Sequence, residues 1–300
     1  MLTTPASPAP DADTADTTAG APGESAAFLA AYLARIGLAA PPPPTLAGLT
    51  ILQAAHQAAI PFEAIDVLTG EGVDLDPQAI AAKLIGARRG GYCFEQNALF
   101  LRVLRATGFA AEGLLGRVRL MVAPDAPPTP RTHMVVRVML DGRPWLADVG
   151  FGALVPPQPL ALDSGAVQPT PHQPYRIAAA GDGPGETFAV MAKVEGEWTM
   201  LYIVDAAPPP AIDYEVGNWY TATHPQSHFR HRLIAARTTA TARYGLLDNR
   251  LTIRGAGGSV ERRWLDADGI AAALRDIFGL AVRPGWRTAI ERAATAEVPG

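Results

Sequence analysis

The chain has 300 residues, of which 48% are hydrophobic and 18% charged, with 29 glycines and 28 prolines. This composition is typical of a compact protein rich in turns and excludes disorder over the whole chain. Because the formal net charge is −4, we expect no general attraction to nucleic acid or to an anionic membrane. The single cysteine, Cys93, excludes a framework of intramolecular disulfides.

Residues 1–23 contain no lysine or arginine and no apolar run, so they do not resemble a signal peptide. A segment of Ala, Thr, Pro and Asp buries little apolar surface, and we therefore expect a disordered leader. No stretch reaches the roughly 18 consecutive apolar residues of a membrane span. These features predict a cytoplasmic protein, in which a lone thiol stays reduced.

Apolar residues at helical spacing predict a helical bundle over residues 24–110. The last of its four predicted helices opens at the glycine-rich segment 88–97, RRGGYCFEQN, and runs to Gly108. The other three predicted helices begin at Ser25, Thr45 and Asp76, where a capping side chain precedes the apolar pattern.

The pattern changes after Gly108 to short runs typical of β-strands. These runs predict a β domain over residues 111–215, followed by a mixed α/β unit over 216–300 that closes with a helix at 268–278. We therefore expect an α+β fold of three units. The predicted strands lie at 114–122, 132–140, 144–151, near 175, at 188–194 and 198–204, and as pairs at 242–253 and 259–265.

Cys93 lies in the first turn of the predicted fourth helix, directly after Gly90 and Gly91. The free N–H groups and the positive dipole end of a helix favour the thiolate form of a cysteine, which is the nucleophilic form. This position therefore predicts a reactive cysteine. The alternative is a small buried apolar side chain, which is the usual role of a lone cysteine.

A predicted hairpin brings a base toward this thiol. A two-residue Asp141–Gly142 turn pairs Leu140 with Arg143, and the alternation of side chains then places His133 and Asp148 on one face of the sheet. We expect Asp148 to accept Nδ1–H of His133, which leaves Nε2 for Cys93. A three-residue loop would put the two side chains on opposite faces, and a surface histidine with an unrelated aspartate is the alternative.

Three segments together resemble the arylamine N-acetyltransferases. They are RGGYCFEQN at 89–97, THMVVRV at 132–138 and WLADVGFG at 145–152, which match the family's cysteine, strand-opening histidine and aspartate at Cys93, His133 and Asp148. Two further segments match in the same order, PFEAIDVL at 61–68 and NWYTATHPQSHF at 218–229. The resemblance covers roughly residues 24–285, and Ala64 stands where the family usually has Asn.

The resemblance implies a helical bundle, a β-barrel and an α/β lid around a cysteine-protease-like catalytic core. It also implies ping-pong acetyl transfer from acetyl-CoA to a small aromatic amine or hydrazine, with no metal. Cys93 is then the nucleophile, His133 the base and Asp148 the residue that orients the imidazole.

The resemblance further implies binding residues around that triad. The aromatic acceptor would contact Phe62, Tyr92, Phe151 and Phe229, and CoA would pass Thr132, Gly150, Phe151 and Phe229. Ordinary core positions are the alternative for these phenylalanines. Arg89 and Glu95 are expected to be structural ion-pair partners, and Ala64 is expected to leave one hydrogen bond of the family pattern unmade.

Several alternatives stay open from the sequence. An amide synthase that takes a longer polyketide acyl donor, a cysteine hydrolase or transglutaminase, and a binding protein that has kept the fold without activity would share these motifs. A zinc site at His224, His228 and His231 is disfavoured, because Pro225 interrupts the spacing and no fourth ligand is near. The preferred amine and the oligomeric state, including a homodimer, are left undetermined.

Overall fold

A computed structural model describes residues 22–123, 125–180 and 186–297 of the chain. The predicted helices of the first third are confirmed, although the first begins at Pro22 rather than Ser25, and residues 1–21 of the expected leader lie outside the described residues. These elements are α1 (Pro22–Ile36), α2 (Leu46–Ala59), α3 (Ile65–Thr69), α4 (Pro77–Ala81), the π-helical turn η1 (Ala82–Gly86) and α5 (Cys93–Ala106).

The capping residues expected from the sequence begin two of these helices. Thr45 accepts a hydrogen bond from the Gly48 amide at the start of α2, at 3.2 Å. Asp76 accepts from the amides of Gln78 and Ala79 at the start of α4. Both contacts satisfy N–H groups that have no partner inside a helix, so the local sequence fixes where each helix starts.

A seven-stranded antiparallel sheet forms the middle of the described chain, in the order β5-β4-β3-β2-β8-β7-β6. Gln168 connects the two ends of this sheet, because its side chain pairs with the Ala161 backbone in β5 and its main chain pairs with Tyr175 in β6. The sheet is therefore nearly closed and barrel-like. Its strands are β2 (Ala110–Val118), β3 (Arg131–Leu140), β4 (Arg143–Ala147), β5 (Leu160–Ala161), β6 (Tyr175–Ala179), β7 (Thr187–Val194) and β8 (Glu197–Asp205).

The predicted hairpin register between β3 and β4 is confirmed. Leu140 pairs with Arg143 and Val136 with Ala147. Asp141 and Gly142 have φ values of 49° and 75°, as a two-residue hairpin turn requires. The ladder stops at Ala147, so the residues that follow leave the sheet at its rim.

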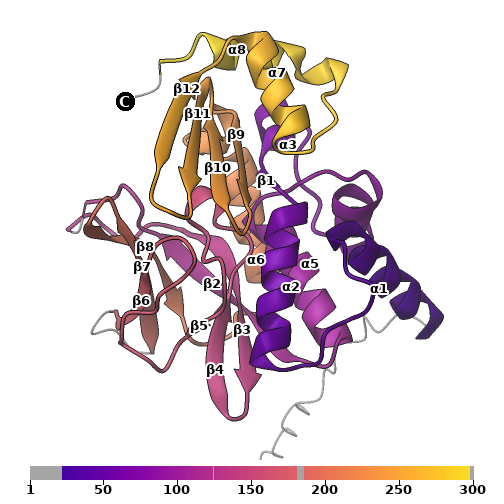
Figure 1. Ribbon diagram of the computed structural model, residues 1–300, viewed down its shortest axis with the longest axis vertical. Coiled ribbons are helices and arrows are strands. Elements are labelled where there is room, and N and C mark those ends of the chain that lie inside the picture. The colour runs from indigo at the N-terminus through magenta and orange to yellow at the C-terminus, as the bar shows by residue number, and fades with distance from the viewer. Residues whose placement is uncertain (1–21, 124, 181–185, 298–300) are drawn as a thin grey trace, which may run out of the picture.

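A second, five-stranded sheet has the order β1-β9-β10-β11-β12 and joins both ends of the described chain. Its edge strand β1 (Phe62–Glu63) comes from the helical third of the sequence and pairs with β9, where Phe62 faces Ala236. In Figure 1 this sheet lies at the top with α7 and α8, while α1, α2 and α5 lie beside the seven-stranded sheet. Its other strands and the nearby helices are β9 (Ile234–Thr238), β10 (Ala242–Leu247), β11 (Arg250–Gly255), β12 (Val260–Trp264), α6 (Ala211–Thr223), α7 (Ala267–Asp276) and α8 (Arg287–Ala294).

The sequence missed the helices α3, α6 and α8 and the strands β1, β5 and β9. Helix α6 has no side-chain cap at Pro210, and its Ile212, Val216 and Trp219 are exposed, so the usual signals of a helix start and a buried stripe are absent. Strand β9 is five residues long, and β1 and β5 have two residues each. No described helix is long and apolar enough to cross a bilayer.

Candidate active site

The cysteine lies at the first position of α5. Glu95 accepts a hydrogen bond from the Tyr92 amide at 3.0 Å, which ends the glycine-rich segment and begins the helix at Cys93. The Cys93 side chain is buried, and its sulfur lies 3.4 Å from the Thr132 carbonyl oxygen at the start of β3. The packing of α5 on β3 therefore brings the thiol to the rim of the barrel-like sheet.

His133 and Asp148 meet beside this thiol, as the hairpin register predicted. His133 Nε2 lies 2.9 Å from Asp148 Oδ2, and the two side chains are 2% and 0% exposed. The nitrogen assignment expected from the sequence is wrong, because Nε2 and not Nδ1 faces the carboxylate. Because Nε2 is occupied by Asp148, the hydrogen bond between His133 and Cys93 is left to Nδ1.

Four hydrogen bonds fix the Asp148 carboxylate. Oδ2 accepts from His133 and from the Tyr202 hydroxyl, each at 2.9 Å. Oδ1 accepts from the Asn97 side chain at 3.0 Å and from the Gly150 amide at 2.8 Å. All the lone-pair directions of a buried carboxylate are thus occupied, which favours its ionised form and one orientation.

The charges of this pair reinforce each other. Burial alone would raise the pKa of Asp148, but the neighbouring His133 charge and these hydrogen bonds hold it below the ordinary value. Burial alone would lower the pKa of His133, but Asp148 and the contact with Cys93 raise it to about 9. At neutral pH the imidazole therefore keeps its proton beside the ionised Asp148 carboxylate.

Asn97 and Tyr202 belong to the site but were not identified from the sequence. Asn97 donates to the Met134 carbonyl at 2.7 Å and accepts from the Val149 amide at 3.1 Å, so it joins α5 to both arms of the hairpin. Its spacing of four residues from Cys93 placed it on the same helical face and was an available signal. Tyr202 comes from β8, and no local pattern marks it.

The loop after β4 approaches the thiol closely. A Cβ atom added to Gly150 would lie 2.7 Å from the Cys93 Cα and 2.7 Å from the Asn97 side-chain nitrogen, so only glycine fits. Gln53 and Gln57 of α2 donate from Nε2 to the Asp148 carbonyl, at 3.2 and 3.0 Å. The backbone of this loop is therefore held by α2 and α5 together.

Aromatic rings lie on two sides of the triad. Phe151 packs against His133 with ring centroids 4.9 Å apart. Phe62 and Tyr92 lie 6.0 and 5.8 Å from Phe229, in the same apolar cluster as Cys93. Tyr92 is fully buried and its hydroxyl donates to the Asn218 side chain, so it supports Phe229 from within the core.

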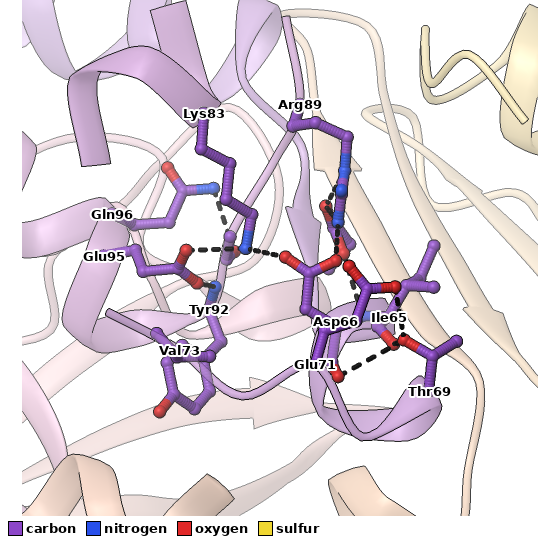
Figure 2. Close-up of polar contacts among 12 residues, drawn as sticks. Ile65, Asp66, Thr69, Glu71, Val73, Lys83, Arg89, Tyr92, Glu95 and Gln96 are labelled. Carbon is purple, nitrogen blue, oxygen red and sulfur yellow. Dashed lines mark hydrogen bonds and ion pairs between the residues drawn. The ribbon is translucent and has the colours of Figure 1, made fainter. Parts of the chain in front are cut away.

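A second buried polar group, the ion-pair cluster, lies beneath the start of α5. Figure 2 shows Lys83 between the carboxylates of Glu95 and Asp66, at 2.6 and 2.7 Å, with Arg89 on the far side of Asp66. Arg89 also binds Glu63 at 2.7 Å. Arg89 and Glu95 therefore both form ion pairs, as expected, but with other residues and not with each other. Burial raises the pKa of Glu95 to about 7, even with Lys83 beside it.

Ala64 follows Glu63 of this cluster in the sequence and lies at the N-cap position of α3. Ala64 precedes α3 and makes no side-chain capping hydrogen bond. Glu63 accepts from the Ile65 amide instead, at 2.8 Å. The Glu63 carboxylate thus satisfies one backbone N–H group at the start of α3.

The three histidines near the end of α6 do not converge. His231 Nε2 lies 2.6 Å from the Pro225 carbonyl oxygen, and the His224 Nδ1 accepts from the Gln226 amide. Within the described part of the chain, no group of three or more His, Cys, Asp or Glu side chains is arranged to hold a metal ion.

A buried cysteine, histidine and aspartate at the junction of a helix and a barrel-like sheet define a mixed α+β protein with a cysteine-protease-like core. A family profile described as N-acetyltransferase matches residues 45–286. Arylamine N-acetyltransferases from Mycolicibacterium smegmatis and Escherichia coli are 44% and 40% identical to the chain, over 84% of its length and 91% and 88% of theirs. The Mycobacterium marinum arylamine N-acetyltransferase, solved in complex with CoA, superposes with a TM-score of 0.83 at 40% identity, covering 88% of this chain and 99% of that one.

These similarities extend over most of the chain. The chain therefore belongs to the arylamine N-acetyltransferase family, whose members are acyltransferases.

Proposed function

We propose that this chain transfers the acetyl group of acetyl-CoA to an arylamine or hydrazine in two half-reactions, with Cys93 as the acetyl carrier. The observation that carries the proposal is the position of Cys93 at the first residue of α5, against the buried His133–Asp148 pair. The family membership of the chain and the CoA bound to the M. marinum relative support the choice of donor.

In the first half-reaction the Cys93 sulfur attacks the carbonyl carbon of the thioester, and the bond from that carbon to the CoA sulfur breaks. His133 gives its Nδ1 proton to the leaving CoA sulfur, so that CoA departs as a thiol and the imidazole becomes neutral. The Cys93 amide, at the start of α5, has no acceptor within the helix and can donate to the carbonyl oxygen as negative charge develops there.

In the second half-reaction the amine nitrogen attacks the acetyl carbon, and the bond to the Cys93 sulfur breaks. The neutral His133 takes a proton from the amine, which restores the imidazolium and thiolate and releases the amide. Asp148 keeps the Nε2–H of His133 in place throughout, so that only Nδ1 exchanges protons with the substrates.

The surroundings of the thiol fit these substrates. We assign the aromatic acceptor to the side of Phe62 and Phe229, which lie in the apolar cluster around Cys93. We assign the path of CoA to the rim formed by Thr132, Gly150 and Phe151, where the backbone comes closest to the thiol.

The first test is to incubate the protein with acetyl-CoA and no acceptor, and then to measure its intact mass. We expect one acetyl group on Cys93 in the wild type and none in Cys93→Ala. Release of free CoA without a covalent adduct, or full turnover by Cys93→Ala, would overturn the proposal.

A second measurement distinguishes the acyl donor and acceptor. Initial rates with aniline, hydrazine and aminobenzoate should depend on the acceptor, while the acetylation half-reaction should not. Faster transfer from longer acyl-CoA donors than from acetyl-CoA would instead support an amide synthase. Peptide cleavage without CoA would support a hydrolase.

A further inference from the structure

A cavity of about 460 Å³ lies apart from Cys93, between the ends of α1 and α2, strand β9 and the residues that follow α7. Its volume falls within the roughly 300–1,000 Å³ of small-molecule sites. Three arginines line it, namely Arg35 from α1, Arg88 from the segment before α5, and Arg237 from β9. We refer to this cavity as the arginine pocket.

The positive charge of the arginine pocket has no carboxylate to balance it. None of its lining residues is acidic, and no described Asp or Glu forms an ion pair with Arg35, Arg88 or Arg237. Arg35 makes hydrogen bonds to the carbonyls of Leu84, Ala59 and Arg88. Arg237 makes two, to the carbonyls of Ala58 and Ile277, at 2.7 Å each.

The C-terminal end of α2 offsets only part of the positive charge of the arginine pocket. Ala58 and Ala59 lie in the last turn of α2, where the helix dipole supplies roughly half a negative charge. The three positive charges of the guanidinium groups are several times larger than this partial negative charge. Arg35 is only 7% exposed, so water cannot hydrate its charge fully. A buried charge without a counter-ion is costly.

The electrostatic environment agrees with this description. Burial, together with the positive charges of Arg88 and Arg237, lowers the pKa of Arg35 to about 10. Arg35 is therefore close enough to Arg88 and to Arg237 to be repelled by both. A bound anion would replace that repulsion with attraction.

Within the described residues, all the side-chain donors of Arg88 are free, and the two hydrogen bonds of Arg237 use Nε and Nη1 and leave Nη2 available. Arg88 is exposed, and its side chain makes no hydrogen bond with the described part of the chain. Its backbone has a φ of 52°, in the left-handed region that is unfavourable for residues with a side chain, and its carbonyl accepts from Arg35. Strained backbone of this kind concentrates at ligand sites.

We propose that the arginine pocket binds the phosphate group of a small molecule, at a site separate from that of acetyl-CoA. Guanidinium groups match phosphate oxygens in both charge and fork-shaped geometry, and they donate strongly to them. A phosphate held by Arg35, Arg88 and Arg237 joins α1, β9 and the segment that leads to Cys93. This site does not depend on the acetyl-transfer reaction proposed above.

The test is calorimetric titration of the full-length protein with inorganic pyrophosphate at low ionic strength. We expect a one-to-one binding event that weakens about tenfold or more in R88Q, the effect of losing one charge-assisted hydrogen bond. R287Q is the matched control, because Arg287 is an exposed arginine that does not line the pocket, and it should bind as the wild type does.

Two further measurements distinguish the arginine pocket from the acetyl-CoA site and from a site for any anion. The KM for acetyl-CoA should stay within about twofold of wild type in R88Q. A rise in that KM parallel to the loss of pyrophosphate binding would assign the anion to acetyl-CoA itself and overturn a separate site. Equal binding by R88Q and wild type, no binding event at all, or tighter binding of citrate than of pyrophosphate would also overturn the proposal.

Discussion

Two buried polar clusters flank the first turn of α5, and they handle charge in opposite ways. In the triad, one carboxylate, Asp148, receives four hydrogen bonds and faces a single imidazole. In the ion-pair cluster, the carboxylates of Glu63, Asp66 and Glu95 share Lys83 and Arg89, so almost every charge has a direct counter-charge.

The difference shows what each cluster can do. Matched ion pairs hold chain segments together but leave no group able to exchange a proton at a reacting atom. A carboxylate fixed by neutral donors keeps its full charge for the imidazole, and it raises the pKa of His133 to about 9. We therefore expect damage to the triad to cost activity, and damage to the ion-pair cluster to cost stability.

The largest effect should come from Asp148→Asn. The asparagine nitrogen would face His133 Nε2 and force the ring proton onto Nδ1, the nitrogen that exchanges protons with the substrates in the proposed mechanism. We expect kcat to fall roughly 10³–10⁴-fold while the protein stays folded. Steady-state rates and circular dichroism would check this, with Asp163→Asn on the exposed side of the barrel as control. Near-normal kcat in Asp148→Asn would contradict the assigned role.

The ion-pair cluster is tested by Lys83→Met. Removing Lys83 leaves Glu95 and Asp66 buried without one of their cations, and we expect unfolding to become easier by about 3 kcal/mol. The kcat of the folded fraction should stay within about threefold of wild type. Lys193, the other lysine of the chain, is exposed, and Lys193→Met is the matched control for urea denaturation. A large loss of kcat in folded Lys83→Met would remove the distinction between the two clusters.

The parts of this site that sequence could predict are those governed by local rules. A two-residue turn and the alternation of a strand placed His133 beside Asp148, and glycines before a capped helix placed Cys93 at its start. Which ring nitrogen of His133 faces Asp148 depends on how deeply α5 packs against β3, and no local sequence pattern indicates this. Tyr202 reaches Asp148 across 54 residues of sequence, so only the barrel-like sheet reveals it.

The same limit explains the errors in the fold. Strand β1 has two residues and exists because β9 lies next to it in space, although more than 170 residues separate the paired positions Phe62 and Ala236. The exposed apolar residues of α6 gave no amphipathic signal. Long helices with capping side chains, such as α2, were predicted because their signal lies within one segment.

The dependence of stability on pH separates the clusters further. Since the pKa of His133 is about 9 in the folded chain, above its ordinary 6.5, its stabilising contribution is complete below pH 6.5 and is lost as the pH rises through 9. The difference in Tm between wild type and His133→Gln should therefore shrink by at least about 3 °C from pH 6 to pH 9.5. Thermal unfolding across this range would measure it, with His224→Gln as a control outside the site. A difference that grows with pH would contradict the assigned charge state.

The smallest effect concerns the edge of the ion-pair cluster, where Ala64 precedes α3 without a capping side chain. Ala64→Asn supplies an acceptor for the free amides of the first helical turn, and we expect a gain of about 0.5–1 kcal/mol in the free energy of unfolding. The gain stays near the low end because Glu63 already accepts from the Ile65 amide. Ala64→Val adds similar bulk with no acceptor, so equal urea midpoints for the two variants would assign the effect to packing. Destabilisation by Ala64→Asn would show that its amide is buried without partners, since this position is only 5% exposed.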